Sequence, residues 1–210
     1  TLVDSETLNN YACAQILDDA GFGEYTAQDV SDRFTGHKIS GIFKIIEQES
    51  GRAMPDDMVE RFLTAVQSNA RRFLKPDTDI LETVGFLEPH AKLCVGSNGE
   101  IKNILLSLSL TTLDRYFPDD IVFSAGLVGK GKPAPDLFLH AASKMKAAPE
   151  KCLVVEDSQA GVQAAVAAGM KVIGVTHFHH EPDMLKQRLL SAGANDIIGD
   201  FKDLRKIVSF

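Results

Sequence analysis

The sequence predicts an α/β fold, a doubly wound parallel sheet with an inserted α-helical domain. After about residue 76, short apolar runs alternate with helical segments, which is the pattern of parallel strands covered by helices on both faces. Before that point only helical periodicity is found, which favours a separate helical domain. We therefore expect a core formed by residues 1–7 and 78–210 and a helical domain formed by residues 8–77.

The composition excludes several classes of protein. With 44% hydrophobic and 24% charged residues, the 210-residue chain is typical of a globular protein with a buried core. The net charge of −7 argues against nucleic acid or an acidic membrane surface as the main partner. No apolar run approaches the ~18 residues of a membrane span, and the first residues do not resemble a signal peptide. We expect a cytoplasmic protein, monomeric or homodimeric, with Cys94 and Cys152 as buried thiols.

Helices are expected throughout the first domain. Apolar residues recur at helical spacing, and Thr26 with Asp29 has the spacing of a capping box. The expected helices are residues 5–20, a short helix after Thr26, and residues 39–49 and 55–74.

The core alternates between the two kinds of element. Short apolar runs bounded by Gly, Pro or polar residues predict the strands, and longer amphipathic segments predict the helices. The expected strands are residues 91–95, 121–123, 152–155, 172–175 and 196–198. The expected helices are residues 79–87, 100–107, 133–145, 160–168, 184–190 and one that ends near residue 208.

Polar residues follow the predicted strands where an open parallel sheet binds its ligands. Ser97 and Asn98 follow the first strand, Glu156 and Asp157 follow the third, and Lys132 lies in a loop between them. Adjacent carboxylates at a strand end repel each other unless a cation is present, and such oxygen ligands suit Mg²⁺. Each residue also has a structural alternative: Ser97 and the two acids as helix caps, and Lys132 as a solvated loop residue.

Four motifs together resemble the haloacid dehalogenase superfamily. They are TLVDSE at 1–6, VGSNG at 95–99, GKPAPD at 131–136 and VVEDSQAG at 154–161. The chain is most similar to the phosphatase and β-phosphoglucomutase branch, and residues 116–119 and 138–142 resemble bacterial 6-phosphogluconate phosphatases. This resemblance implies a Rossmann-like core and identifies the helical domain as a cap inserted after the first core strand.

The resemblance also implies roles for the polar residues. Ser97 would hydrogen-bond the phosphoryl group with Asn98 beside it, and Lys132 would offset negative charge. Glu156 and Asp157 would hold Mg²⁺ directly or through water. The implied activity is Mg²⁺-dependent hydrolysis of a small phosphorylated metabolite, in particular a sugar phosphate, through an aspartyl-phosphate intermediate.

The chain departs from the family at one motif. The family carries its nucleophile and its general acid–base in a D-x-D-G motif on the first core strand, directly before the residues that match Thr1. We expect these aspartates just upstream of Thr1 in a longer chain. If the motif is truly absent, the alternative is a non-catalytic sugar-phosphate-binding domain. A phosphosugar mutase is a further alternative, which Asn9 disfavours because mutase relatives carry a histidine there.

Substrate choice is expected to come from the helical domain. His37 and Lys38 would suit an anionic or polyhydroxyl substrate, although a turn with solvated side chains is an equal alternative. The histidines of residues 177–180 are interpreted as part of a loop at the rim of the site, with a metal site as the alternative.

Overall fold

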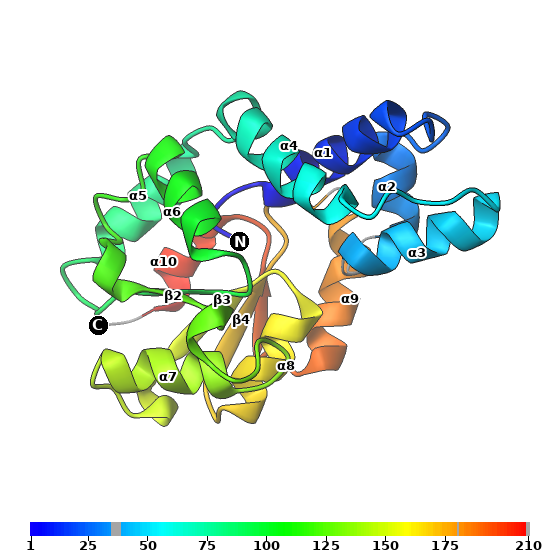
Figure 1. Cartoon of the computed structure of the whole chain (residues 1–210). Coiled ribbons are helices and arrows are strands. Elements are labelled where there is room, and N and C mark those ends of the chain that lie inside the picture. The colour runs from blue at the N-terminus through cyan, green and yellow to red at the C-terminus, as the bar shows by residue number, and fades with distance from the viewer. Residues whose placement is uncertain (35–38, 180, 209–210) are drawn as a thin grey trace. The chain divides into compact units, whose positions relative to one another are not determined.

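The computed structural model describes residues 1–34, 39–179 and 181–208 (Figure 1). The chain divides into two compact units, one made of Thr1–Val3 with Pro76–Phe210 and the other of Asp4–Lys75. We call them the core unit and the helical unit. That the helical unit acts as a cap stays a prediction.

The helical unit is built from four helices. They are α1 (Ser5–Asp19), α2 (Ala27–Phe34), α3 (Ile39–Ser50) and α4 (Met58–Phe73). The predicted capping box is confirmed, since the Thr26 N–H donates to Asp29 Oδ2 at 2.9 Å and the Asp29 N–H to Thr26 Oγ1 at 3.2 Å. Helix α4 begins three residues later than expected, because the Met58 N–H donates to the Pro55 carbonyl at 3.4 Å in a preceding turn.

The core unit alternates between strands and helices, as the sequence predicts. Its strands are β1 (Val95–Ser97), β2 (Val122–Ser124), β3 (Leu153–Glu156), β4 (Lys171–Val175) and β5 (Asp196–Ile198). Its α-helices are α5 (Thr78–Leu87), α6 (Ile101–Leu110), α7 (Asp136–Lys144), α8 (Gln159–Ala167), α9 (Pro182–Ala192) and α10 (Leu204–Ile207). Four short 3₁₀ helices join them: η1 (Asp119–Ile121), η2 (Ala125–Leu127), η3 (Pro149–Lys151) and η4 (Phe201–Asp203).

The strands are all parallel, and they form two sheets. Strand β1 pairs with β2, and the second sheet has the order β3-β4-β5. The α/β fold with parallel strands is thus confirmed, but the described strands do not form one continuous sheet. The resemblance places a further strand at the centre of the sheet, and within the described residues no strand pairs with both β1 and β3.

The first strand is shifted from its expected position at residues 91–95. Strand β1 covers Val95–Ser97, because only these residues face partners, from Val122 to Ser124, on β2. Residues 91–94, which were expected to belong to this strand, lie before the first residue that pairs with β2. Cys94 is consequently exposed and Cys152 is half-buried, which corrects the expectation of buried thiols.

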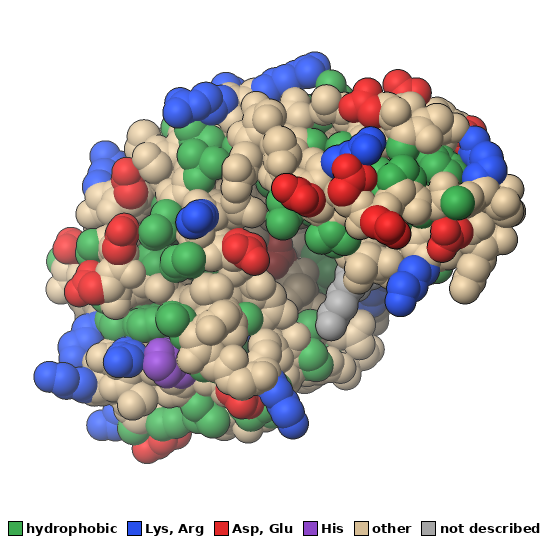
Figure 2. All heavy atoms as spheres, in the orientation of Figure 1, with side chains coloured by type: hydrophobic (Ala, Val, Ile, Leu, Met, Phe, Trp, Pro, Cys, Tyr) green, Lys and Arg blue, Asp and Glu red, His purple; other side chains and the backbone are tan. Residues whose placement is uncertain are grey.

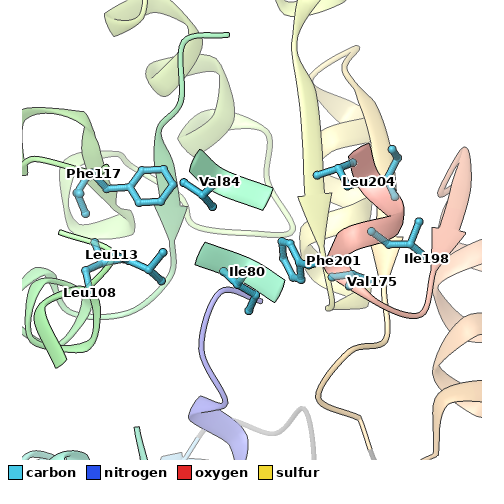
Figure 3. Packing of buried hydrophobic residues seen from close by; sticks show 11 residues of the cluster. Ile80, Val84, Leu108, Leu113, Phe117, Val175, Ile198, Phe201 and Leu204 are labelled. Carbon is cyan, nitrogen blue, oxygen red and sulfur yellow. The ribbon is translucent and has the colours of Figure 1, made fainter. Parts of the chain in front are cut away.

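A large apolar cluster fills the core unit on one side of the β3-β4-β5 sheet (Figure 3). It joins α5 and the segment after α6 to the last strands and η4. The residues labelled in Figure 3 are Ile80, Val84, Leu108, Leu113, Phe117, Val175, Ile198, Phe201 and Leu204. This packing anchors the start of α5, where the chain enters the core unit from the helical unit.

The described surface carries charges of both signs. On the face shown in Figure 2, acidic and basic side chains are interspersed rather than gathered by sign. None of the helices in the described part of the chain has the length and hydropathy of a membrane span.

Candidate active site

Three strands of the core unit end in polar residues. Ser97 ends β1, Ser124 ends β2 and Glu156 ends β3. Ser97 and Ser124 are opposite each other in the parallel register. The strand ends therefore gather hydroxyl and carboxylate groups, as the sequence predicts for a ligand-binding edge.

Lys132 and Glu156 form a buried ion pair between Lys132 Nζ and Glu156 Oε1. Their side chains are only 10% and 5% exposed. The other carboxylate oxygen, Glu156 Oε2, accepts the Ser158 hydroxyl at 2.9 Å, and Ser158 in turn caps α8 by accepting the Gly161 N–H at 3.0 Å. Lys132 Nζ also lies 4.8 Å from the centre of the Phe138 ring. The cation is thus held between Glu156 and Phe138, which excludes the solvated-lysine alternative.

Asn98 holds the backbone of Lys132. The Lys132 N–H donates to Asn98 Oδ1 at 2.8 Å, and Asn98 Nδ2 donates to the Lys132 carbonyl at 3.0 Å. Both polar groups of the amide are engaged by one residue. The structure therefore brings Asn98 and Lys132 together, and the direct substrate contact expected of Asn98 stays a prediction.

Ser97 is the last residue of β1, directly before the loop that follows it. Its Oγ accepts the Gly99 N–H at 3.1 Å, so the Ser97 hydroxyl can donate its own hydrogen to a ligand. The Gly99 carbonyl accepts the Ser124 hydroxyl at 2.7 Å. Sequence reasoning missed Ser124, whose signal is a hydroxyl directly after the apolar run at residues 121–123.

Asp157 follows Glu156 and contacts the start of the chain. The Thr1 hydroxyl donates to Asp157 Oδ1 at 2.6 Å, and the Thr1 amino nitrogen lies 2.9 Å from Oδ2. Burial alone would raise the pKa of Asp157, whereas the hydrogen bond from the Thr1 hydroxyl lowers it. An aspartate carboxylate is ordinarily ionised at neutral pH.

The oxygen ligands present here fit a magnesium ion that is bound by few protein groups. Asp157 offers a carboxylate at the end of β3 that accepts a hydrogen bond from the Thr1 hydroxyl. Glu156 is engaged by Lys132 and Ser158, which favours Asp157 as the carboxylate in direct contact. The part of the chain that the structure describes contains no cluster of three or more acidic, His or Cys residues suited to a metal. Mg²⁺ commonly uses only one or two protein carboxylates and keeps its remaining waters.

The remaining predicted residues are His37, Lys38 and the histidines of residues 177–180. His37 and Lys38 lie outside the described residues. His177 lies with Nε2 3.0 Å from Asp77 Oδ2 and Nδ1 3.6 Å from Asp200 Oδ1, and His179 Nδ1 accepts the Glu181 N–H at 3.0 Å. These contacts give His177 and His179 partners within their own loop and its neighbours, and His180 lies outside the described residues.

Comparisons with known proteins identify the family of the chain. A family model described as haloacid dehalogenase-like hydrolase matches residues 1–175. The chain is 32% identical over 174 residues to the 6-phosphogluconate phosphatase of Escherichia coli K12, covering 82% of this chain and 76% of that protein. It is 30% identical over 176 residues to a fructose-1-phosphate phosphatase of the same organism, covering 83% and 91%.

Solved structures share the fold. A hydrolase of this family from Deinococcus radiodurans R1, with bound phosphate and sodium, superposes with a TM-score of 0.81 at 26% identity, covering 98% of this chain and 89% of that one. The predicted resemblance is confirmed by these matches. The chain therefore belongs to the haloacid dehalogenase-like hydrolase family, and the expectation that it is a hydrolytic enzyme is confirmed.

Proposed function

We propose that this enzyme is a Mg²⁺-dependent phosphatase that hydrolyses a small phosphorylated metabolite, in particular a sugar phosphate. The observation that carries the proposal is the convergence of a held cation, a hydroxyl donor and an ionised carboxylate at the ends of β1 and β3. A phosphate monoester brings two negative charges, and its transition state is stabilised by positive charge and hydrogen-bond donors.

Lys132 supplies the positive charge. Its ammonium group is held between Glu156 and Phe138 at 10% exposure, so little rotamer freedom remains to be lost when a phosphoryl group binds. Ser97 supplies a neutral donor from the end of β1. Together they would bind the non-bridging oxygens of the phosphoryl group.

Asp157, with Glu156 beside it, would hold the magnesium ion. When bound, Mg²⁺ would act as a Lewis acid that neutralises charge on the phosphoryl oxygens. The chain's own contribution is an ionised carboxylate at the end of β3, fixed in position by the adjacent strand and α8.

The nucleophile and the general acid–base are proposed to be two aspartates N-terminal to Thr1. This assignment is supported by the family, whose motif directly precedes the residues matching Thr1, and by the position of Thr1 against Asp157. The first aspartate would attack phosphorus and form an aspartyl-phosphate, while the second protonates the leaving alcohol. Water activated by the second aspartate would then release phosphate and restore the carboxylate.

The substrate class is supported by similarity to phosphatases named for 6-phosphogluconate and fructose 1-phosphate. Transfer of the phosphoryl group within a sugar, as a β-phosphoglucomutase performs, is the alternative outcome. Asn9 at the position of the mutase histidine favours hydrolysis.

A phosphate-release screen tests the function. Protein with a verified N-terminus is assayed against sugar phosphates with and without Mg²⁺, and β-glucose 1-phosphate is followed for interconversion. We expect Mg²⁺-dependent release of inorganic phosphate. Lys132→Ala and Asp157→Asn are each expected to lower kcat about 10²- to 10³-fold, since each removes charge stabilisation of the transition state.

Lys130→Ala is the matched control. Lys130 is exposed in the same loop, two residues from Lys132, and its removal changes the net charge equally. Equal losses for the two lysine variants would contradict the specific role of Lys132. Interconversion without phosphate release would replace the phosphatase by a mutase.

A further inference from the structure

We propose that Asn98 is a positioning residue that fixes Lys132 for catalysis and does not itself bind substrate. This inference rests on the proposed function for its catalytic consequence and on the contacts of Asn98 for its structural part. A side-chain amide offers one acceptor oxygen and one donor nitrogen, and the backbone of Lys132 engages both, at 2.8 Å and 3.0 Å.

Gly131, next to Lys132, supports a specific contact between the loop and the Asn98 side chain. A Cβ atom at Gly131 would lie 2.6 Å from Asn98 Oδ1 and 3.0 Å from the Cβ of Ala125. Only a residue without a side chain lets the loop approach the amide this closely. The loop sequence and the Asn98 side chain are therefore matched to each other.

The amide also connects the two sheets. Asn98 follows β1, its amide accepts from the Lys132 N–H and donates to the Lys132 carbonyl, and Lys132 Nζ reaches Glu156 at the end of β3. Because β1 and β3 share no ladder in the described structure, this side-chain relay links Ser97 of one sheet to the acidic pair of the other. Loss of the amide releases the backbone of Lys132 while leaving the Lys132 side chain chemically unchanged.

A double-mutant cycle tests the catalytic consequence. Asn98→Ala is expected to lower kcat/KM about 10- to 100-fold through misplacement of Lys132. In a Lys132→Ala background the same substitution is expected to cost less than about 2-fold, because the group that it positions is gone. Additive losses would overturn the proposal and indicate direct contact between Asn98 and the substrate.

A spectroscopic readout tests the structural part without activity. The side-chain ammonium signal of Lys132, assigned by its loss in Lys132→Ala, is shifted by the Phe138 ring and by Glu156. In Asn98→Ala this signal is expected to move toward that of exposed Lys130, and an unchanged signal would overturn the proposal. Asn98→Asp, which keeps the acceptor and loses the donor, is the second variant should the alanine variant fail to fold.

The two proposals fail separately. A wild-type enzyme that releases no phosphate would count against the phosphatase, while the Lys132 signal would still decide whether Asn98 positions the lysine.

Discussion

Two glycines make room for the polar side chains of the site. Gly131 lies against Asn98, and Gly161 in the first turn of α8 lies against the Glu156 carboxylate, which a Cβ at that position would overlap. Both glycines therefore define how closely the backbone approaches a charged or polar group. The site therefore requires residues without a side chain at these two positions, as well as the residues that carry the chemistry.

Replacing Gly131 tests this dependence. Gly131→Ala is expected to displace the Asn98 amide and lower kcat/KM about 10- to 100-fold, because displacement of a reacting group by about 1 Å costs on that order. Gly129→Ala is the matched control, since a Cβ at Gly129 would meet no atom within 4 Å. Steady-state phosphate release by both variants decides the matter, and equal activities would contradict the steric argument.

The sequence predicts candidate site residues, but it does not predict their partners. The motifs around Ser97, Lys132 and Asp157 indicate phosphoryl chemistry from the sequence alone. The pairing of Lys132 with Glu156, and the capture of the Lys132 backbone by Asn98, depend on how separate strands come together. Nothing in the local sequence specifies those contacts.

At the scale of elements, a histidine joins three segments of the core unit. His177, in the loop after β4, contacts Asp77 before α5 and lies near Asp200 before η4. Asp77 also caps α5 by accepting the Ile80 N–H at 3.0 Å. The Lys202 ammonium lies 3.2 Å from Asp200 and 3.7 Å from Asp79 and balances the acidic groups around the imidazole. One cluster therefore fixes the start of α5.

This cluster predicts a pH-dependent contribution to stability. Partial burial would raise the pKa of Asp77, but hydrogen bonds from His177 and Ile80 lower it below its ordinary value. A lowered folded-state pKa stabilises the protein above the unfolded pKa of about 4, and this stability is lost as pH falls through the folded pKa. Asp77→Asn is therefore expected to lower the melting temperature at pH 7 and to match wild type at the acidic end.

A comparison of Asp77→Ala with Asp77→Asn separates the contribution of the helix cap to stability from the contribution of the charge. Asn still caps a helix, whereas Asp77→Ala loses the cap as well and is expected to cost about 1 kcal/mol more. Thermal unfolding between pH 3 and 8 measures both effects. A Tm difference between wild type and Asp77→Asn that does not change with pH would contradict the assignment.

The boundaries of some helices and strands can be predicted from local sequence patterns, and those of others cannot. The capping box at Thr26 is local, so its prediction is confirmed by two hydrogen bonds. The predicted position of β1 was wrong because a strand needs a partner, and the register with β2 places the strand at Val95–Ser97, which shares only Val95 with the apolar run at residues 91–95. Helix α7 begins at Asp136 rather than at residue 133, since the ring of Pro135 disfavours a helical conformation of Ala134 before it.

On the scale of the whole molecule, the chain has two units with separate cores. The helical unit buries Leu17 and Ile46 fully, and the core unit does the same for Val162 and Val172. The division follows from the sequence, where purely helical periodicity gives way to alternation near residue 76. The described strands form two sheets, and the resemblance places a further strand at the centre of the sheet.

Separate cores predict separate loss of protection from hydrogen exchange. Leu17→Ala is expected to destabilise the protein by about 2–5 kcal/mol and to speed amide exchange chiefly in α1–α4. The large-to-small change Val172→Ala is expected to act chiefly on β3, β4 and β5. Hydrogen exchange of the full chain measures both, and uniform acceleration by either variant would indicate one cooperative unit.

The two hydrogen bonds between Asn98 and position 132 involve only the main chain of that position, so they do not depend on the side chain that the loop presents. These backbone contacts can therefore persist when the side chain at position 132 is changed. A single substitution at position 132 can therefore change or abolish the chemistry of the site while the contacts between Asn98 and the backbone of the loop remain. The same property makes position 132 a natural place to convert the enzyme into a receptor that holds its ligand without consuming it.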